Sequence, residues 1–125
     1  MRYLENESVW LLSAPAGEDY EIAVPGDPGG PIPALLDLAN RALPSVTSLR
    51  TRAIALFDEF IRLEAFSEQS HWHFEGVDLG HPIRHATGRL RLTFSRDGDT
   101  YGEWSVLFQE SNGRFFPVQF NRTSI

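Results

Sequence analysis

The apolar residues of the C-terminal half recur at every second position, and this period constrains the fold more than any other feature of the sequence. Four stretches between residues 71 and 121 alternate large apolar side chains with polar ones. A period of two places the apolar members on one face of a β-strand. Four strands with one apolar face each predict an antiparallel sheet packed on helices. The expected core positions are Trp72, Phe74, Leu92, Phe94, Trp104, Val106, Phe108, Phe116, Val118 and Phe120.

The loop between the last two strands determines which residues face each other. Ser-Asn-Gly at 111–113 predicts a three-residue hairpin loop with Gly113 in the left-handed conformation. In that register Phe108 pairs with Phe116, and apolar residues face apolar residues along the ladder. A two-residue Asn-Gly loop would set polar residues against apolar ones, because a slip of one residue moves every side chain to the other face. The hairpin expected at 96–100 is compatible with more than one register.

The N-terminal third contains two predicted strands and a predicted loop. Residues 3–12 and 19–24 are rich in apolar and aromatic residues and are separated by a turn-rich segment, which predicts two strands. Residues 25–33 contain four prolines and three glycines. Proline and glycine at this density disfavour both helix and sheet, so we expect an irregular loop.

Two helices are expected between the two groups of strands. Residues 34–43 show helical spacing, Pro44 interrupts it, and residues 46–66 form a long amphipathic helix with a Phe-rich stripe. The stripe contains Val46, Leu49, Ala53, Leu56, Phe57, Phe60 and Ile61. The sequence therefore predicts one α+β domain over residues 1–125: two N-terminal strands, two helices and a four-stranded antiparallel meander. In its core, the strand residues should meet Leu49, Ala53, Leu56, Phe57 and Phe60.

Composition excludes several kinds of chemistry. The chain of 125 residues has no cysteine, so disulfides, thiol catalysis and thiolate metal ligands are ruled out. No segment reaches the roughly 18 consecutive apolar residues of a membrane span, and the N-terminus has no apolar run of signal-peptide length. We therefore expect a cytoplasmic protein without a membrane partner. Sequence motifs for a nucleophile elbow, a P-loop, a dinucleotide fold or a zinc protease are also missing, which favours a protein that is not an enzyme.

Charge points to the kind of partner. The formal net charge is −6, which argues against nucleic acid, since nucleic-acid-binding proteins usually present a positive surface. Residues 1–27 contain six acidic residues and a single arginine. Such an acidic region can attract a basic protein, although it is also typical of a solvated edge. The acidic residues are Glu5, Glu7, Glu18, Asp19, Glu21 and Asp27.

The histidines allow a second hypothesis. His71, His73 and Glu75 share one face of a predicted strand, opposite Trp72 and Phe74. This pattern could bind zinc, and His81 or His85 could supply the third ligand in place of Glu75. The chain would then be a metal-binding protein or a small metal-dependent enzyme. The alternative is a polar strand face without a cofactor, because histidines at a surface are more common than metal sites.

A protein-binding surface is expected on the side of the sheet that faces away from the helices. Arginine, tyrosine and exposed apolar residues together are typical of such surfaces. The candidate partner-binding residues are Arg89, Arg91, Tyr101, Glu103, Leu107 and Phe115. A protein partner, basic in charge, or a further copy of the chain would suit this face. The alternative is that another part of the chain, such as the N-terminal strands, covers it.

The last two strands also resemble a group of known proteins. Tyr101 begins a Tyr-Gly-x-Trp-x-Val-x-Phe strand, Pro117 begins a Pro-x-x-Phe-x-Arg strand, and Trp-His-Phe-Glu-Gly-Val-Asp-Leu-Gly at 72–80 precedes both. About fifty residues are similar to small uncharacterised bacterial α+β proteins, some of them immunity proteins of toxin systems. The resemblance implies a cytoplasmic protein that neutralises a toxin by contact, and it brings no catalytic residues.

Overall fold

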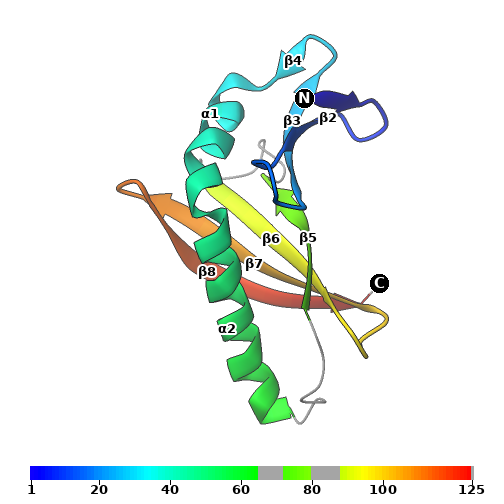
Figure 1. Cartoon of the computed structure of the whole chain (residues 1–125), viewed down its shortest axis with the longest axis vertical. Helices are drawn as coiled ribbons and strands as arrows, with labels where there is room; N and C mark the ends of the chain where they lie inside the picture. Colours follow the sequence, from blue (N-terminus) through cyan, green and yellow to red (C-terminus); the bar gives the residue numbers. More distant parts are fainter. Residues whose placement is uncertain (65–71, 80–87, 125) are drawn as a thin grey trace.

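The computed structural model describes residues 1–64, 72–79 and 88–124, and for residues 61–64 it describes the backbone alone. Eight strands form one sheet, which packs against a helical layer (Figure 1). The strands are β1 (Arg2–Leu4), β2 (Val9–Ser13), β3 (Glu21–Asp27), β4 (Gly30–Pro31), β5 (Trp72–Asp78), β6 (Arg89–Arg96), β7 (Gly102–Ser111) and β8 (Arg114–Ser124). Their order across the sheet is β1-β2-β3-β5-β6-β7-β8, and β4 pairs with β3. The predicted α+β class and mostly antiparallel sheet are confirmed.

The helical layer forms one segment. Helix α1 (Pro33–Ala42) runs through a 3₁₀ turn (Leu43–Ser45) into α2 (Val46–Glu64) without an intervening loop. Pro44 lies in the 3₁₀ turn, so its missing N–H group falls where the regular helix is already interrupted. The expected pair of separate helices is therefore corrected to a single helical connection that contains a turn at the proline.

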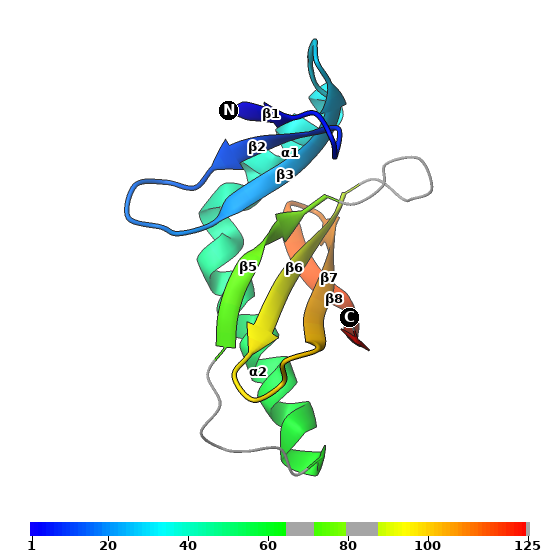
Figure 2. The same cartoon turned by 90° about the vertical axis from the view of Figure 1, so that its right-hand side faces the viewer.

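This helical connection joins two halves of the sheet. It leads from β3 to β5, which pair in parallel with Ile22 beside Val77 and Ala23 beside Asp78. The other strand pairs of the described residues are antiparallel. In Figure 2, β1, β2 and β3 lie beyond one end of β5 and the meander β5–β8 forms the rest of the sheet, with the helices behind.

The N-terminal region contains more strands than the sequence suggested. The expected single strand over 3–12 is divided by a turn, in which Ser8 has a φ of 54°. The expected loop over 25–33 instead contains the end of β3 and the short strand β4. Both differences have one cause. Strands β1, β2 and β4 have only two to five residues each, which is too short for an alternating pattern to be recognised in the sequence.

The core lies between the helices and the sheet. Phe57 of α2 is fully buried, and its ring centre lies 4.8 Å from that of Trp72, 5.4 Å from Phe94 and 5.5 Å from Trp104. The expected core residues of β6 and β7 are all fully buried: Leu92, Phe94, Trp104, Val106 and Phe108. Leu90 of β6 is fully buried as well. The helix stripe is confirmed for Val46, Leu49, Ala53 and Phe57, whereas Leu56 and Phe60 each remain 36% exposed. The side chain of Ile61 lies outside the described residues.

The last hairpin differs from the expected register. Ser111 pairs with Arg114, so the loop consists of Asn112 and Gly113 alone, with φ angles of 53° and 76°. Both central residues adopt the left-handed conformation that a two-residue loop of this type requires. The three-residue loop predicted from the apolar alternation is therefore wrong.

A bulge in β8 shifts the pairing of β7 with β8 by one residue further along the hairpin. Phe108 pairs with Pro117 but Leu107 pairs with Gln119, which leaves Val118 without an opposite residue. One extra residue on one strand reverses the alternation. Beyond the bulge, Val106 faces Phe120, and apolar residues again share the helix side of the sheet. Phe116 and Val118, expected in the core, are 42% and 52% exposed, and Phe120 is 37% exposed although it lies on the helix side.

Candidate partner-binding surface

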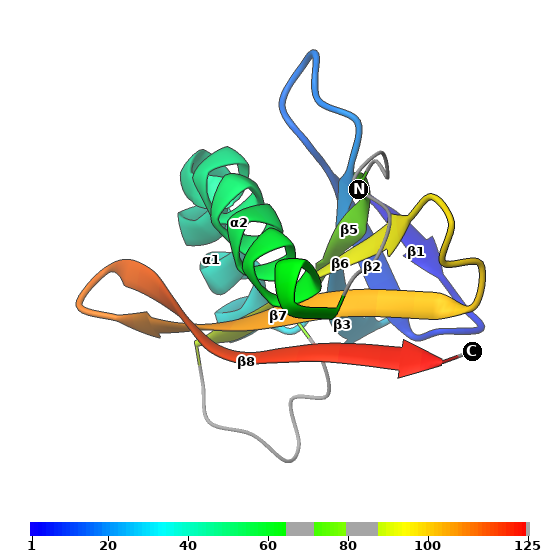
Figure 3. The same ribbon diagram turned by 90° about the horizontal axis from the view of Figure 1, so that it is seen from below.

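The face of the sheet away from the helices consists of rows of neighbouring side chains. Figure 3 shows α1 and α2 together on one side of the strands. On the other side, Asp78 lies beside Arg91, Arg91 beside Leu107, and Leu107 beside Gln119. The row therefore crosses four strands and contains an acid, a base, an apolar residue and an amide, which is the mixed chemistry expected of a protein-binding face.

Five of the six predicted partner-binding residues are accessible or half-buried. Arg91 and Glu103 are exposed on the outer face. Tyr101 is 69% exposed and lies in the turn before β7. Arg89 and Leu107 are half-buried, and the Nε of Arg89 donates to Oε1 of Gln109 at 2.8 Å.

Phe115 is the exception and is corrected. Its side chain is only 6% exposed and belongs to the core. The two-residue turn sets Phe115 opposite Glu110, whose carboxylate reaches the helical layer. Phe116, which sequence analysis assigned to the core, takes the exposed place beside Gln109 instead.

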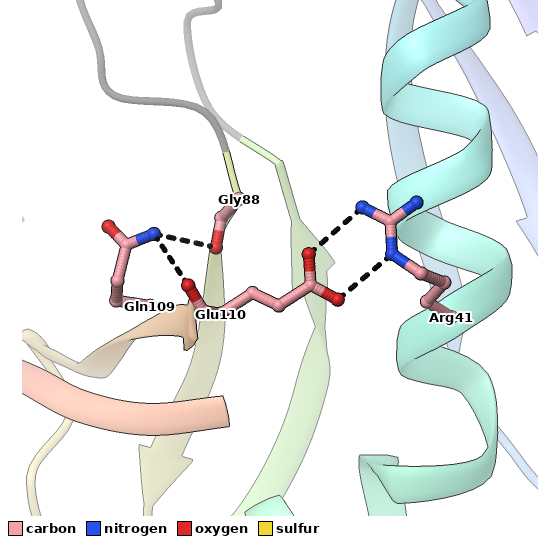
Figure 4. A network of polar contacts seen from close by, with 4 residues as sticks. All are labelled: Arg41, Gly88, Gln109 and Glu110. Carbon is pink, nitrogen blue, oxygen red and sulfur yellow. Dashed lines mark hydrogen bonds and ion pairs between the residues drawn. The ribbon is translucent and has the colours of Figure 1, made fainter. Parts of the chain in front are cut away.

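A polar network holds the helical layer to the end of this hairpin (Figure 4). The Nε and Nη2 atoms of Arg41 in α1 donate to the two carboxylate oxygens of Glu110 in β7, both at 2.9 Å. This hydrogen bonding lowers the pKa of Glu110 and raises that of Arg41. The adjacent Gln109 donates from Nε2 to the carbonyl oxygens of Glu110 at 3.1 Å and Gly88 at 3.4 Å. These contacts tie α1 to the end of the β7–β8 hairpin and to the residue before β6.

The described residues include only part of the predicted metal site. Three of the four histidines lie outside them: His71, His81 and His85. His73 is 2.8 Å from Oδ1 of Asp97 through its Nε2 atom, and Glu75 accepts a 2.6 Å hydrogen bond from the hydroxyl of Ser95. Within residues 1–64, 72–79 and 88–124, no group of three or more ligating side chains could hold a metal ion. Zinc binding at His71, His73 and Glu75 remains a prediction.

The outer face also contains a hollow that sequence analysis missed. It has a volume of about 280 Å³, and its lining comes from β2, β3, β5 and β6. The lining residues are Leu11, Glu21, Ala23, Glu75, Gly76, Val77, Asp78 and Thr93. Three of them are carboxylates from two strands that are far apart in the sequence. Only the parallel pairing of β3 with β5 brings these carboxylates together, and no local pattern indicates that pairing.

A second bulge shapes this hollow. The pairing of β5 with β6 shifts between Phe74 and Gly76, and Gly76 has a φ of 151°, a conformation that favours glycine. The bulge leaves Glu75 exposed and turns Val77 into the core. On the opposite side of the hollow, Glu21 accepts a 3.3 Å hydrogen bond from the exposed side chain of Arg2.

Comparison with known proteins adds no assignment to this geometry. No family model, no curated protein and no solved structure matches the chain. Within the described residues, the helices are too short or too polar to cross a membrane.

Proposed function

We propose that this chain is a non-enzymatic protein-binding module of the immunity type, which neutralises a basic protein by contact with the outer face of its sheet. The observation that carries the proposal is the hollow between β2, β3, β5 and β6, whose lining combines apolar and acidic side chains. The alternative, a metal-binding protein or small metal-dependent enzyme that uses His71 and His73, depends on His71, which lies outside the described residues.

The hollow suits the side chain of an arginine or lysine on a partner. Leu11 and Ala23 offer apolar surface to the aliphatic stem of such a side chain. Glu21 and Glu75 offer carboxylate oxygens to its charged end, and a guanidinium group can bind two such oxygens at once. The volume of about 280 Å³ accommodates one side chain rather than a folded element.

The surroundings of the hollow extend this contact. Arg91, Glu103 and the half-buried Leu107 continue the face across β6 and β7. An interface of standard size buries on the order of 800 Å² per partner, so a partner seated in the hollow would also cover these residues. The immunity role rests on the resemblance of the C-terminal half to small uncharacterised bacterial proteins, some of them immunity proteins, and on the net charge of −6, which suits a basic toxin.

The proposal is tested by capture of a basic protein from the native host and by a charge-neutral variant of the hollow. Glu75→Gln removes one carboxylate but keeps an acceptor for the hydroxyl of Ser95. We expect it to weaken binding of the captured protein about tenfold, or 1.4 kcal/mol. Asp37→Asn is the matched control, because Asp37 is an exposed acid on α1, in the layer across the sheet.

Neutralisation is measured separately from binding. Co-production of the wild-type chain with the captured protein should restore growth, and Glu75→Gln should restore it less. Equal binding by Glu75→Gln and Asp37→Asn would remove the hollow from the proposal. Normal growth without the chain would remove its immunity role.

A further inference from the structure

Strand β8 leaves one edge of the sheet open along most of its length. It spans eleven residues, Arg114–Ser124, and pairs with β7 on one side. In the part of the chain that the structure describes, no strand pairs with its other side, which forms the margin of the sheet in Figure 3. The opposite edge strand, β1, has only three residues. An open edge of this length is a template for pairing with another strand.

The usual protections of an edge strand cover only part of β8. Pro117 and the bulge at Val118 interrupt regular pairing near the hairpin loop. Residues 115–121 contain no charged side chain, although charges are a common defence of exposed edges. The charge of Arg122 is matched by Asp99, whose carboxylate oxygens lie 2.6 Å from Nη2 and 2.9 Å from Nε. The stretch after the bulge is therefore both open and nearly neutral.

An apolar strip runs beside this edge. Phe60 of α2 and Phe120 of β8 have ring centres 5.1 Å apart, and both remain more than a third exposed. Leu56, one turn before Phe60, is 36% exposed, and Val118 is 52% exposed. A single exposed apolar residue needs no explanation, but a contiguous group at an open edge is typical of an interface.

We propose that the open edge of β8 and this apolar strip bind a second copy of the chain, with the two β8 strands antiparallel about a twofold axis. In antiparallel pairing, residues directly opposite share a face. A register centred on Phe120 keeps both helical layers on one side of the joined sheet. It places Phe120 against Phe120 of the partner subunit, and Asn121 against Gln119 of the partner subunit.

Charge and area favour a second copy as the occupant. In this register Arg122 faces Val118 of the partner subunit, so no like charges are opposed along the seam. A fully exposed Phe presents about 150–250 Å², so the strip offers a few hundred Å², below the roughly 800 Å² per partner of a standard interface. In a pair of identical chains each brings both an apolar strip and an open edge of the same length, so backbone hydrogen bonds along β8 add to the apolar contact.

Self-association of the full chain tests the proposal. The mass in solution is measured by light scattering and sedimentation from micromolar to submillimolar concentration. We expect wild type to form dimers and Val118→Lys to associate at least tenfold more weakly, because it places a charge at the seam. Ile32→Lys is the matched control: Ile32 is 38% exposed at the start of α1, away from β8, and this variant should still dimerise. Melting of each variant shows that it is folded.

A crosslink tests the register. The chain has no cysteine, so one introduced thiol reports one position. Asn121→Cys should be joined to its copy by a short bismaleimide, whereas Asn40→Cys on the exposed surface of α1 should not. A wild type that is monomeric at every concentration overturns the proposal, and so does a dimer that Val118→Lys leaves unchanged. A different protein bound at β8 of a monomeric wild type also overturns it.

Discussion

At the scale of single residues, Asp99 joins three parts of the structure. It accepts hydrogen bonds from Arg122 of β8 and, at 2.8 Å, from Nε1 of the fully buried Trp104 of β7. A Cβ at Gly102 would collide with the carboxylate of Asp99, so another residue at 102 would have to move Asp99 away from its hydrogen-bond partners. Asp99 thus ties the turn between β6 and β7 to both following strands.

Loss of this carboxylate should destabilise the fold. Asp99→Ala leaves the buried indole N–H of Trp104 without this acceptor, and the expected cost is about 1–3 kcal/mol in the free energy of unfolding. Asp97→Ala, two residues earlier, removes an exposed contact with His73 and should cost less than about 1 kcal/mol. Urea unfolding measures both. Equal losses would mean that the bond to Trp104 contributes nothing.

The two paired carboxylates also predict how stability depends on pH. The hydrogen bonds from Arg122 and Arg41 lower the pKa of Asp99 and of Glu110 in the folded chain. A lowered folded-state pKa stabilises the fold above the pKa of the unfolded carboxyl, and this stabilisation is lost as the pH falls through the folded value. The free energy of unfolding should therefore change little between pH 7 and about 5 and fall at lower pH. Asp99→Asn/Glu110→Gln should show a smaller fall; an unchanged slope would contradict this origin.

At the scale of elements, β8 is a strand whose register could not be predicted from the sequence. Alternation correctly assigned the buried faces of β6 and β7, because neither strand contains a bulge over those residues. In β8 the alternation is reversed once by the two-residue loop and again by the bulge, and neither event leaves a mark in the apolar pattern. Arg91 and Glu103 of the candidate surface could be predicted for the same reason, whereas the hollow required the long-range pairing of β3 with β5.

Two neighbouring phenylalanines test the register of β8. Phe115→Ala removes a side chain that is 6% exposed and should cost about 3–5 kcal/mol. Phe116→Ala removes one that is 42% exposed and should cost less than half as much. Chemical denaturation of the two variants under one condition gives the comparison. The reverse order would support the three-residue loop that the structure rejects.

At the scale of the whole molecule, the acidic residues lie unevenly along the chain. Four acidic side chains are exposed in the turns on either side of β2, in the N-terminal part of the sheet that β1, β2 and β3 form: Glu5, Glu7, Glu18 and Asp19. Charges at the margin of an interface act mainly on the rate of encounter with a charged partner. They would therefore complement the hollow, where we propose that the partner is bound.

This division of roles can be measured with the captured partner. Replacement of these four acids by Gln or Asn should slow association about tenfold at low salt and leave dissociation nearly unchanged. The difference from wild type should shrink as salt is added, since screening weakens long-range attraction. Association and dissociation rates over a salt series give the result. A change confined to dissociation would place these acids inside the interface.

The short parallel contact between β3 and β5 has a consequence for the order in which the chain folds. Neighbouring strands of the C-terminal meander are close in sequence and can pair early, whereas β3 reaches β5 only after the whole helical connection is in place. Just two residue pairs form that seam. The N-terminal strands should thus detach as a unit while the meander stays closed, and their amide hydrogens should exchange with solvent well before those of β6 and β7.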